Sequence, residues 1–316
     1  MVLRSRQVML LAVALAATSV IAVASHIGLA DSGRPAAAAS VTLPAKVASY
    51  LGVYEKGAPA SYQPIASFAA AAGRHPDLAG YFSGWAEPFK TGFADAARQH
   101  GAATIVQIDP TDASIGAIAA GDDDDYLRSY ADAVRQFGGP VVIGFGHEMN
   151  ATWYSWGYRH VAPATFVRAW RHLVSVFRGQ GADNVTWLWT VQADLPGSGH
   201  IASWWPGAKY VTWVGIDGYY FKPASTFANV FGRTISQVRL FTSKPVLLSE
   251  TSIGPAAGQV AKVPDLLRGM AAYQTLGLVW FDITQHQGIY HQDWRIEDNR
   301  PAEQVFRQSV GRYLHK

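Results

Sequence analysis

The apolar positions of this chain fall into eight short runs that recur along most of its length. The runs are rich in β-branched or aromatic residues and are separated by polar stretches, a pattern typical of buried β-strands. Because both faces of these runs are apolar, we expect a parallel sheet that is covered on both sides. The predicted strands are Ser49 to Tyr54, Leu78 to Ser83, Thr104 to Ile108, Val141 to Phe145, Val185 to Val191, Val211 to Ile216, Val246 to Leu248 and Leu278 to Ile283.

Longer stretches with helical spacing of apolar residues separate most of the predicted strands. Eight strand and helix units in a chain of 316 residues predict an α/β fold, a single-domain (β/α)8 TIM barrel. A doubly wound open sheet is the alternative, although Met149 stands where its dinucleotide-binding form has a third glycine. The predicted helices include Asp125 to Phe137, Ala164 to Phe177, Phe227 to Phe241, Pro264 to Leu276 and Pro301 to Leu314.

The N-terminal segment has a different pattern from the rest of the chain. Arg4 and Arg6 precede an apolar run from Val8 to Ala24 that ends in small residues. This pattern predicts that residues 1–30 form a signal peptide of a secreted protein, or an uncleaved anchor that is the chain's one contact with a membrane. Residues 31–45 lack apolar periodicity and are predicted to be a linker. The folded domain is then expected to cover residues 46–316.

The charge balance excludes some classes of partner. The chain has 26 Lys and Arg against 23 Asp and Glu, and the formal net charge is +3. Without a dense basic run there is no electrostatic reason to bind nucleic acid, and a neutral substrate fits better. Cysteine is absent, which excludes disulfides and thiolate metal sites. No motif demands a metal or an organic cofactor, so neither is expected, and we expect a monomer.

Two acids follow predicted strands and are candidates for catalysis. Glu148 lies in Gly146-His147-Glu148-Met149-Asn150, and Glu250 follows the seventh strand. The C-terminal ends of all strands meet at one mouth of a barrel, where active sites lie. Glycosidic hydrolysis needs one carboxylic acid that protonates the leaving oxygen and one carboxylate that attacks the anomeric carbon or activates water there. Carboxyl groups about 5 to 5.5 Å apart would give retention, and about 6.5 to 9.5 Å would give inversion.

The surroundings of the two acids favour different protonation states. Apolar neighbours such as Phe145, Trp153 and Trp156 would keep Glu148 protonated, since burial penalises the charged form. A hydrogen bond from Tyr219 would keep Glu250 ionised.

On these residues the chain resembles glycoside hydrolase family 26, from about the third strand to the eighth. The segment from His147 to Asn150, followed by Trp153 and Trp156, is similar to the family segment around its acid/base glutamate. The resemblance implies that Glu148 is the acid/base, that Glu250 is the nucleophile and that Tyr219 contacts it. Trp280 resembles the aromatic floor of the sugar subsite next to the cleaved bond.

The resemblance implies a retaining endo-β-glycanase that binds a β-linked polysaccharide or oligosaccharide. Phe281 stands where some mannan-cleaving members carry an arginine, which weakens the case for β-mannan over mixed-linkage β-glucan and leaves a β-xylan as an alternative. A non-catalytic carbohydrate-binding or wall-associated protein is the rival function. Aromatic rings near strand ends suit either one, because sugar rings present flat apolar faces. The rings near predicted strand ends are Tyr54, Trp85, Trp153, Trp156, Tyr219, Tyr220 and Trp280.

The candidate residues also have structural interpretations. His147 alone is more often a structural histidine than a ligand, and Ala151 removes the last histidine of the zinc motif H-E-x-x-H. Contact with the sugar or with Glu250 is the alternative role of His147. Glu250 alone would fit the start of a helix, whose dipole stabilises an acid. The pair of acids, rather than either one, therefore carries the hypothesis of catalysis.

Overall fold

The computed structural model describes residues 42–193, 197–284 and 292–315. The predicted signal peptide or anchor, and most of the predicted linker, lie outside these residues. Within them, no helix is both long enough and apolar enough to pass through a lipid bilayer.

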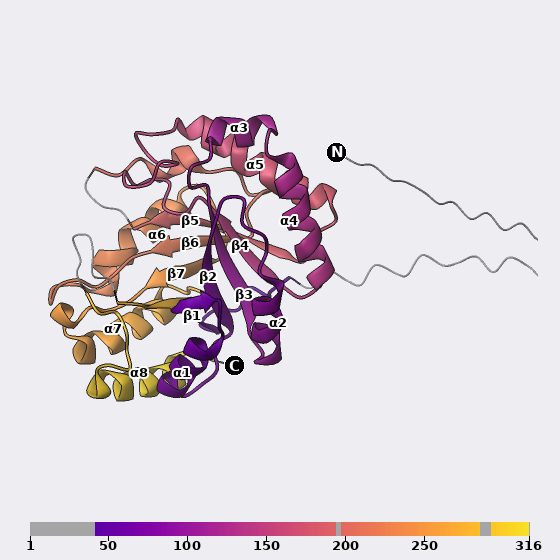
Figure 1. The fold of residues 1–316 in the computed structure, drawn as a ribbon. Coiled ribbons are helices and arrows are strands. Elements are labelled where there is room, and N and C mark those ends of the chain that lie inside the picture. The colour runs from indigo at the N-terminus through magenta and orange to yellow at the C-terminus, as the bar shows by residue number, and fades with distance from the viewer. Residues whose placement is uncertain (1–41, 194–196, 285–291, 316) are drawn as a thin grey trace, which may run out of the picture. The chain divides into compact units, whose positions relative to one another are not determined.

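Eight parallel strands form a closed barrel in the order of the chain (Figure 1). The last strand pairs with the first, with Tyr50 opposite Gly277 and Glu55 opposite Asp282. The predicted (β/α)8 barrel is thereby confirmed. The strands are β1 (Tyr50–Pro59), β2 (Leu78–Gly84), β3 (Ala103–Asp109), β4 (Val141–Phe145), β5 (Val185–Gln192), β6 (Trp213–Asp217), β7 (Val246–Thr251) and β8 (Gly277–Asp282).

Helices surround the barrel on its outer side (Figure 1). The α-helices are α1 (Gln63–Ala72), α2 (Thr91–Gln99), α3 (Ile115–Ala120), α4 (Asp124–Phe137), α5 (Pro163–Gly179), α6 (Arg233–Arg239), α7 (Gln259–Ala272) and α8 (Arg300–Tyr313). Three shorter helical segments are η1 (Ile201–Trp204), η2 (Ala228–Gly232) and η3 (Pro255–Ala257).

The predicted start of the helix that follows β7 was wrong. Pro264 was expected to start a helix, but α7 begins at Gln259 and continues through Pro264. Proline lacks the N–H that would bond to the carbonyl of Val260, one turn earlier. Val260 is exposed, so water can satisfy that carbonyl and the helix tolerates the proline.

The core has two parts because successive side chains of a strand point to opposite faces. One set fills the barrel and includes Tyr54, Ile105, Leu188 and Val279. The other set packs between the strands and the surrounding helices. Burying one Leu, Ile, Val or Phe side chain contributes about 1.5–3 kcal/mol. Burial of these two layers therefore supplies most of the free energy that favours the closed barrel.

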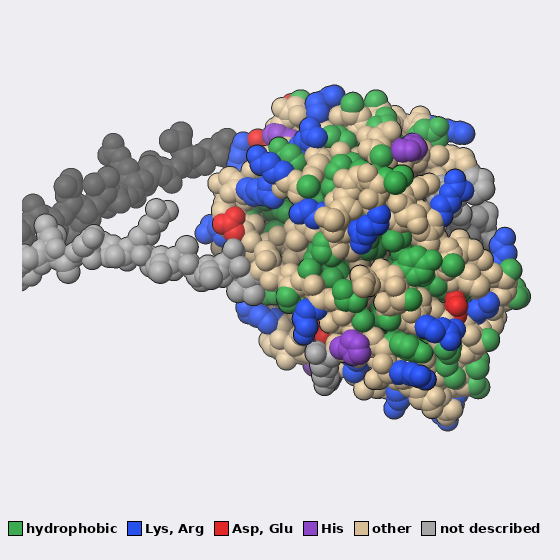
Figure 2. All heavy atoms as spheres, turned by 180° about the vertical axis from the view of Figure 1, so that it is seen from behind, with side chains coloured by type: hydrophobic (Ala, Val, Ile, Leu, Met, Phe, Trp, Pro, Cys, Tyr) green, Lys and Arg blue, Asp and Glu red, His purple; other side chains and the backbone are tan. Residues whose placement is uncertain are grey.

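One face of the molecule carries its basic side chains as separate groups. On the face seen in Figure 2, Lys and Arg side chains are scattered among apolar and neutral ones and do not merge into one continuous patch.

Candidate active site

The backbone after β4 has an unusual conformation that places Glu148 at the mouth of the barrel. Gly146 has φ +53° and Glu148 has φ +54°. These values lie in the left-handed region, which residues other than glycine seldom adopt. Two hydrogen bonds hold this turn: the Glu148 N–H donates to the Thr190 carbonyl (3.0 Å), and the Ala151 N–H donates to the Glu148 carbonyl (2.8 Å). Strained residues of this kind cluster at functional sites.

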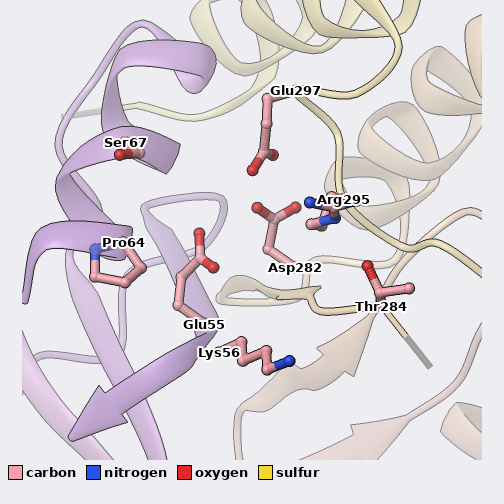
Figure 3. Close-up of a pocket in the computed structure, with 8 residues that line it drawn as sticks. All are labelled: Glu55, Lys56, Pro64, Ser67, Asp282, Thr284, Arg295 and Glu297. Atoms are coloured by element: carbon pink, nitrogen blue, oxygen red, sulfur yellow. The ribbon is translucent and has the colours of Figure 1, made fainter. Parts of the chain in front are cut away.

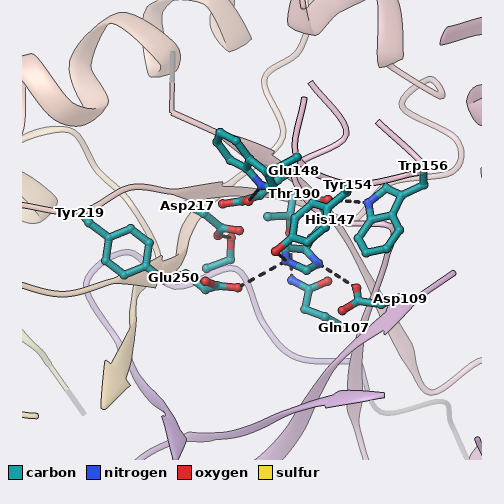
Figure 4. Close-up of polar contacts among 12 residues, drawn as sticks. Gln107, Asp109, His147, Glu148, Tyr154, Trp156, Thr190, Asp217, Tyr219 and Glu250 are labelled. Carbon is teal, nitrogen blue, oxygen red and sulfur yellow. Dashed lines mark hydrogen bonds and ion pairs between the residues drawn. The ribbon is translucent and has the colours of Figure 1, made fainter. Parts of the chain in front are cut away.

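Glycine is required inside β4, just before this turn. A Cβ on Gly144 would lie 1.8 Å from Oε1 of Gln107. The Gln107 side chain crosses the barrel interior and donates to Oγ1 of Thr190 (3.2 Å). Thr190 thus links β3, β5 and the turn that carries Glu148 (Figure 4).

Glu148 is a buried acid whose pKa is raised close to neutral pH. Its side chain is buried, and Nε1 of Trp153 donates to its Oε2 at 2.7 Å. Burial and the charge of Glu250 together raise the pKa of Glu148 to about 7, against the opposing effects of the His147 charge and the Trp153 hydrogen bond. A carboxyl group with this pKa can both give and take a proton near neutral pH.

Glu250 lies on β7 and receives two stabilising contacts. The Tyr219 hydroxyl donates to its Oε2 at 2.6 Å, and Nε2 of His147 lies 4.0 Å from its Oε1. Burial raises the pKa of Glu250, while the His147 charge and the Tyr219 hydrogen bond lower it. These contacts favour the carboxylate, as a nucleophile requires.

His147 is buried, and each of its two ring nitrogens has a partner. Its Nδ1 lies 2.8 Å from Oδ1 of Asp109, and its Nε2 lies 3.1 Å from the Tyr154 hydroxyl (Figure 4). Burial alone would lower the pKa of His147, but the Asp109 carboxylate raises it well above its usual value. The imidazolium therefore places a positive charge beside Glu250.

The sequence analysis missed Asp109, Tyr154 and Asp217, which complete this network. Asp217 is fully buried at the end of β6, opposite Glu250, and accepts a 2.6 Å hydrogen bond from the Ser249 hydroxyl. Burial and the charges of Glu250 and Glu148 raise the pKa of Asp217 well above its usual value, which favours the neutral form of this carboxyl. Asp109 and Asp217 both end strands, and that position at the active face of a barrel was the signal that could have identified them.

The structure corrects the expectation for Trp280. Its ring is fully buried, packs on Phe306 of α8 with centroids 4.8 Å apart, and donates through Nε1 to the Trp294 carbonyl. Alternation along β8 explains this: Trp280 points outward, and Phe281 points inward, where it meets Tyr219 edge-on at 5.8 Å. Trp280 is therefore a core residue and not the floor of a sugar subsite.

The other predicted aromatic positions divide between cleft and core. Trp153 is half exposed (50%) and is free to contact a sugar while it bonds to Glu148. Trp156 is buried, stacks on Tyr154 at 4.3 Å and donates to the His147 carbonyl, so it supports the network instead of facing substrate. Trp85 packs against Tyr126 of α4 and Phe145, on the outer side of the strands.

A pocket of about 270 Å³ opens beside Tyr219. Its lining combines an aromatic ring, Phe221, with the polar side chains of Gln192, Lys222 and Asn229. Such a mixture of an apolar surface and a few polar groups suits a sugar unit. A separate group of acids, Glu55, Asp282 and Glu297, lies near the closure of the barrel, on the outer side of its wall.

Comparison with known proteins supports one family. The model of glycosyl hydrolase family 26 matches residues 112–312. Endoglucanase H of Acetivibrio thermocellus is 28% identical over 264 residues, which are 78% of this chain and 29% of that protein. Mannan endo-1,4-beta-mannosidase A and B of Caldalkalibacillus mannanilyticus is 28% identical over 137 residues, which are 42% of this chain and 25% of that protein. The aligned part of the chain thus spans less than a third of these curated relatives.

Solved structures resemble the fold. The mannanase man26 of Bacillus subtilis superposes with a TM-score of 0.61 at 16% identity, over 84% of this chain and 85% of that one. At this identity the similarity establishes the barrel and nothing about substrate.

Proposed function

Because the chain belongs to glycosyl hydrolase family 26, we propose that it is a retaining endo-β-glycanase that hydrolyses β-mannan or mixed-linkage β-glucan. The observation that carries the proposal is the pair of buried acids at one mouth of the barrel, of which Glu250 bonds to Tyr219 and faces His147. Glu148 is the acid/base and Glu250 is the nucleophile. The residues act by double displacement, without any step that needs a cofactor.

In the first step, Glu148 donates its proton to the glycosidic oxygen while a carboxylate oxygen of Glu250 attacks the anomeric carbon. The bond between the anomeric carbon and the glycosidic oxygen breaks, the leaving sugar departs with a hydroxyl group, and a glycosyl ester of Glu250 remains. In the second step, the Glu148 carboxylate takes a proton from water, whose oxygen attacks the same carbon. Glu250 leaves as a carboxylate, and two inversions give net retention.

The electrostatics support the change of role that Glu148 must make. In the free enzyme the charge of Glu250 raises the pKa of Glu148. Formation of the glycosyl ester removes this charge, so the pKa of Glu148 falls and the carboxylate becomes available as a base. The Tyr219 hydroxyl and the imidazolium of His147 stabilise the charge that Glu250 regains when it leaves.

The substrate class rests on the names of the relatives and on the chemistry of the cleft. One relative is named an endoglucanase and another a mannan endo-1,4-beta-mannosidase. The exposed ring of Trp153 and the mixed pocket beside Tyr219 offer stacking and hydrogen bonds to a neutral sugar. Because a polysaccharide does not enter a cell, we also propose that residues 1–30 direct the protein out of it.

The test measures reducing-sugar release from soluble β-mannan, mixed-linkage β-glucan and β-xylan. We compare the parent with Glu148→Gln and Glu250→Gln, and Glu303→Gln on α8 serves as the matched control. The proposal predicts that the parent releases sugar from β-mannan or β-glucan. Both site variants should lose this activity, and the control should keep it. The first product should have the anomeric configuration of the substrate. A folded parent that binds glycan but releases no sugar would favour the binding protein, and an inverted product would exclude double displacement.

A further inference from the structure

Glu55 and Asp282 are paired acids at the closure of the barrel. They are register partners of neighbouring strands β1 and β8. Their chain neighbours Tyr54 and Phe281 contribute to the cluster inside the barrel, so the two acids point outward, away from the catalytic network. Glu297, which precedes α8, approaches them from the other side (Figure 3).

Such an arrangement is unfavourable without a counter-charge. Like charges directly opposite each other on neighbouring strands destabilise a sheet, and both Glu55 and Asp282 are buried. Oδ1 of Asp282 accepts from the Ile296 N–H at 2.9 Å, but its Oδ2 and Oε2 of Glu297 have no hydrogen-bond partner among the described residues. A buried carboxylate oxygen without a partner is unfavourable, because it has lost its contacts with water and gained none in return. The fully buried Asp282 thus directs an unsatisfied oxygen at the two other acids.

The neighbouring cations compensate the charge of this group only in part. Arg295 lines the same pocket of about 470 Å³, but its guanidinium is bound to Asp293 at 2.7 Å and also to Asp298. Lys56 is exposed at the rim of the pocket. Three carboxyl groups that face one another in this way repel one another when they are ionised and no cation lies between them.

We propose that Glu55, Asp282 and Glu297 bind one calcium ion. One oxygen atom from each residue lies within 4.8 Å of the other two. Calcium binds oxygen at about 2.3–2.6 Å, so oxygens on opposite sides of one ion are up to about 5 Å apart, and all three acids can reach the same ion. Calcium takes six to eight oxygen ligands in flexible geometry, and the open pocket admits water for the remaining positions. Magnesium is less suitable because it demands shorter bonds in a strict octahedron.

The ion would join three parts of the chain that also support the catalytic site. It connects β1, β8 and the segment that leads into α8. In that segment the Trp294 carbonyl accepts hydrogen bonds from Nε1 of Trp280 and from the Ser252 hydroxyl. The Trp294 ring lies 5.0 Å from the ring of Tyr219, the residue that bonds to Glu250. Calcium therefore stabilises the barrel closure and holds the packing behind Tyr219.

The test first removes metals from the full chain with a chelator and then measures its thermal unfolding with and without added calcium. Calorimetric titration of the metal-free protein with calcium gives the number of ions bound. With calcium at about 100 times its Kd, linkage predicts a rise in Tm of about 5 °C or more, and titration gives one ion per chain. Magnesium should give a smaller rise. Glu297→Gln should lose the calcium response, and Glu303→Gln, a neighbouring acid outside the group, should keep it.

Two outcomes would overturn the proposal. One is a parent protein whose Tm is the same in calcium and in chelator and that shows no heat of binding, which would mean that the three acids share protons. The other is an equal calcium response in the parent and in Glu297→Gln, which would place the ion elsewhere. Both readouts measure metal binding alone, so they are independent of the proposed glycanase activity.

Discussion

The indole nitrogen of Trp153 donates a 2.7 Å hydrogen bond to Oε2 of Glu148, the acid that must be protonated for the first step. This bond stabilises the ionised form and lowers the pKa of Glu148, while burial and the charge of Glu250 together raise it to about 7. The protonated fraction therefore dominates below that pH and is lost above it. We expect kcat/KM to fall as the pH rises through about 7.

Trp153→Phe should move this alkaline limb to higher pH. Phenylalanine keeps an aromatic ring but removes the N–H, so the charged form of Glu148 loses a donor and its pKa rises. The pH dependence of kcat/KM measures the change, and Trp85→Phe, outside the network, should leave the limb in place. An unchanged or lowered limb in Trp153→Phe would show that the bond does not control the acid.

Tyr219→Phe should lower kcat by about 10- to 100-fold, the effect of a hydrogen bond of about 1.5–3 kcal/mol to a charged group. The bond lowers the pKa of Glu250, and its loss raises that pKa. Because Glu250 must be ionised to attack, the acid limb of the pH profile should move to higher pH. A variant with unchanged kcat and only a raised KM would assign Tyr219 to substrate binding instead.

Asp109→Asn should remove the charge that keeps His147 protonated. The pKa of His147 is raised in the folded protein, so this group stabilises the fold at low and neutral pH and loses its contribution as the pH rises through the folded value. We expect the variant to lose about 2–4 kcal/mol of unfolding free energy at neutral pH, somewhat less than for a fully buried pair because Asp109 is partly exposed. Urea unfolding at several pH values measures this loss, and equal losses at neutral and at strongly alkaline pH would contradict the explanation.

Gly144→Ala should destabilise the barrel by about 3 kcal/mol or more, since the new Cβ would overlap Oε1 of Gln107. Gly92→Ala is the matched control, because a Cβ on this helical glycine of α2 meets nothing within 4 Å. The control should be neutral or slightly stabilising. Similar unfolding free energies for the two variants would show that Gln107 moves aside without cost.

Because Trp280 points outward and Phe281 points inward, we expect loss of the first side chain to affect mainly stability and loss of the second to affect mainly activity. Trp280→Ala should cost about 3–5 kcal/mol of unfolding free energy, because it empties a fully buried site against α8. Phe281→Ala should cost less stability and lower kcat more, because Phe281 packs against Tyr219. If the opposite order were found, the assignment of Trp280 to the core would be wrong.

The barrel could be predicted from the sequence because each strand is apolar on both faces. This is a property of the local sequence and does not depend on tertiary contacts. β4 was predicted with its observed bounds, Val141–Phe145. The direction of a side chain was harder to predict. A run in which both faces are buried does not show which face turns inward, so the sequence pattern could not test the subsite position that the resemblance implied for Trp280.

The sequence could predict those residues of the candidate site that lie in a distinctive sequence segment. The segment around Glu148 is specific enough to indicate the family, and the structure brings Glu148, Glu250, His147, Tyr219 and Trp153 together. The catalytic roles of these residues stay predictions. The group of Glu55, Asp282 and Glu297 was not predictable, because its members lie far apart in the chain and become neighbours only when β1 meets β8.

The pairing of β1 with β8 also has a consequence for synthesis. The ribosome makes the strand that begins at Tyr50 long before the strand that begins at Gly277. Until the later strand emerges, β1 exposes an open edge that can pair with other chains. The nascent protein therefore completes its hydrogen-bonded wall only after nearly the whole domain has been translated, and an open edge that lasts this long favours aggregation.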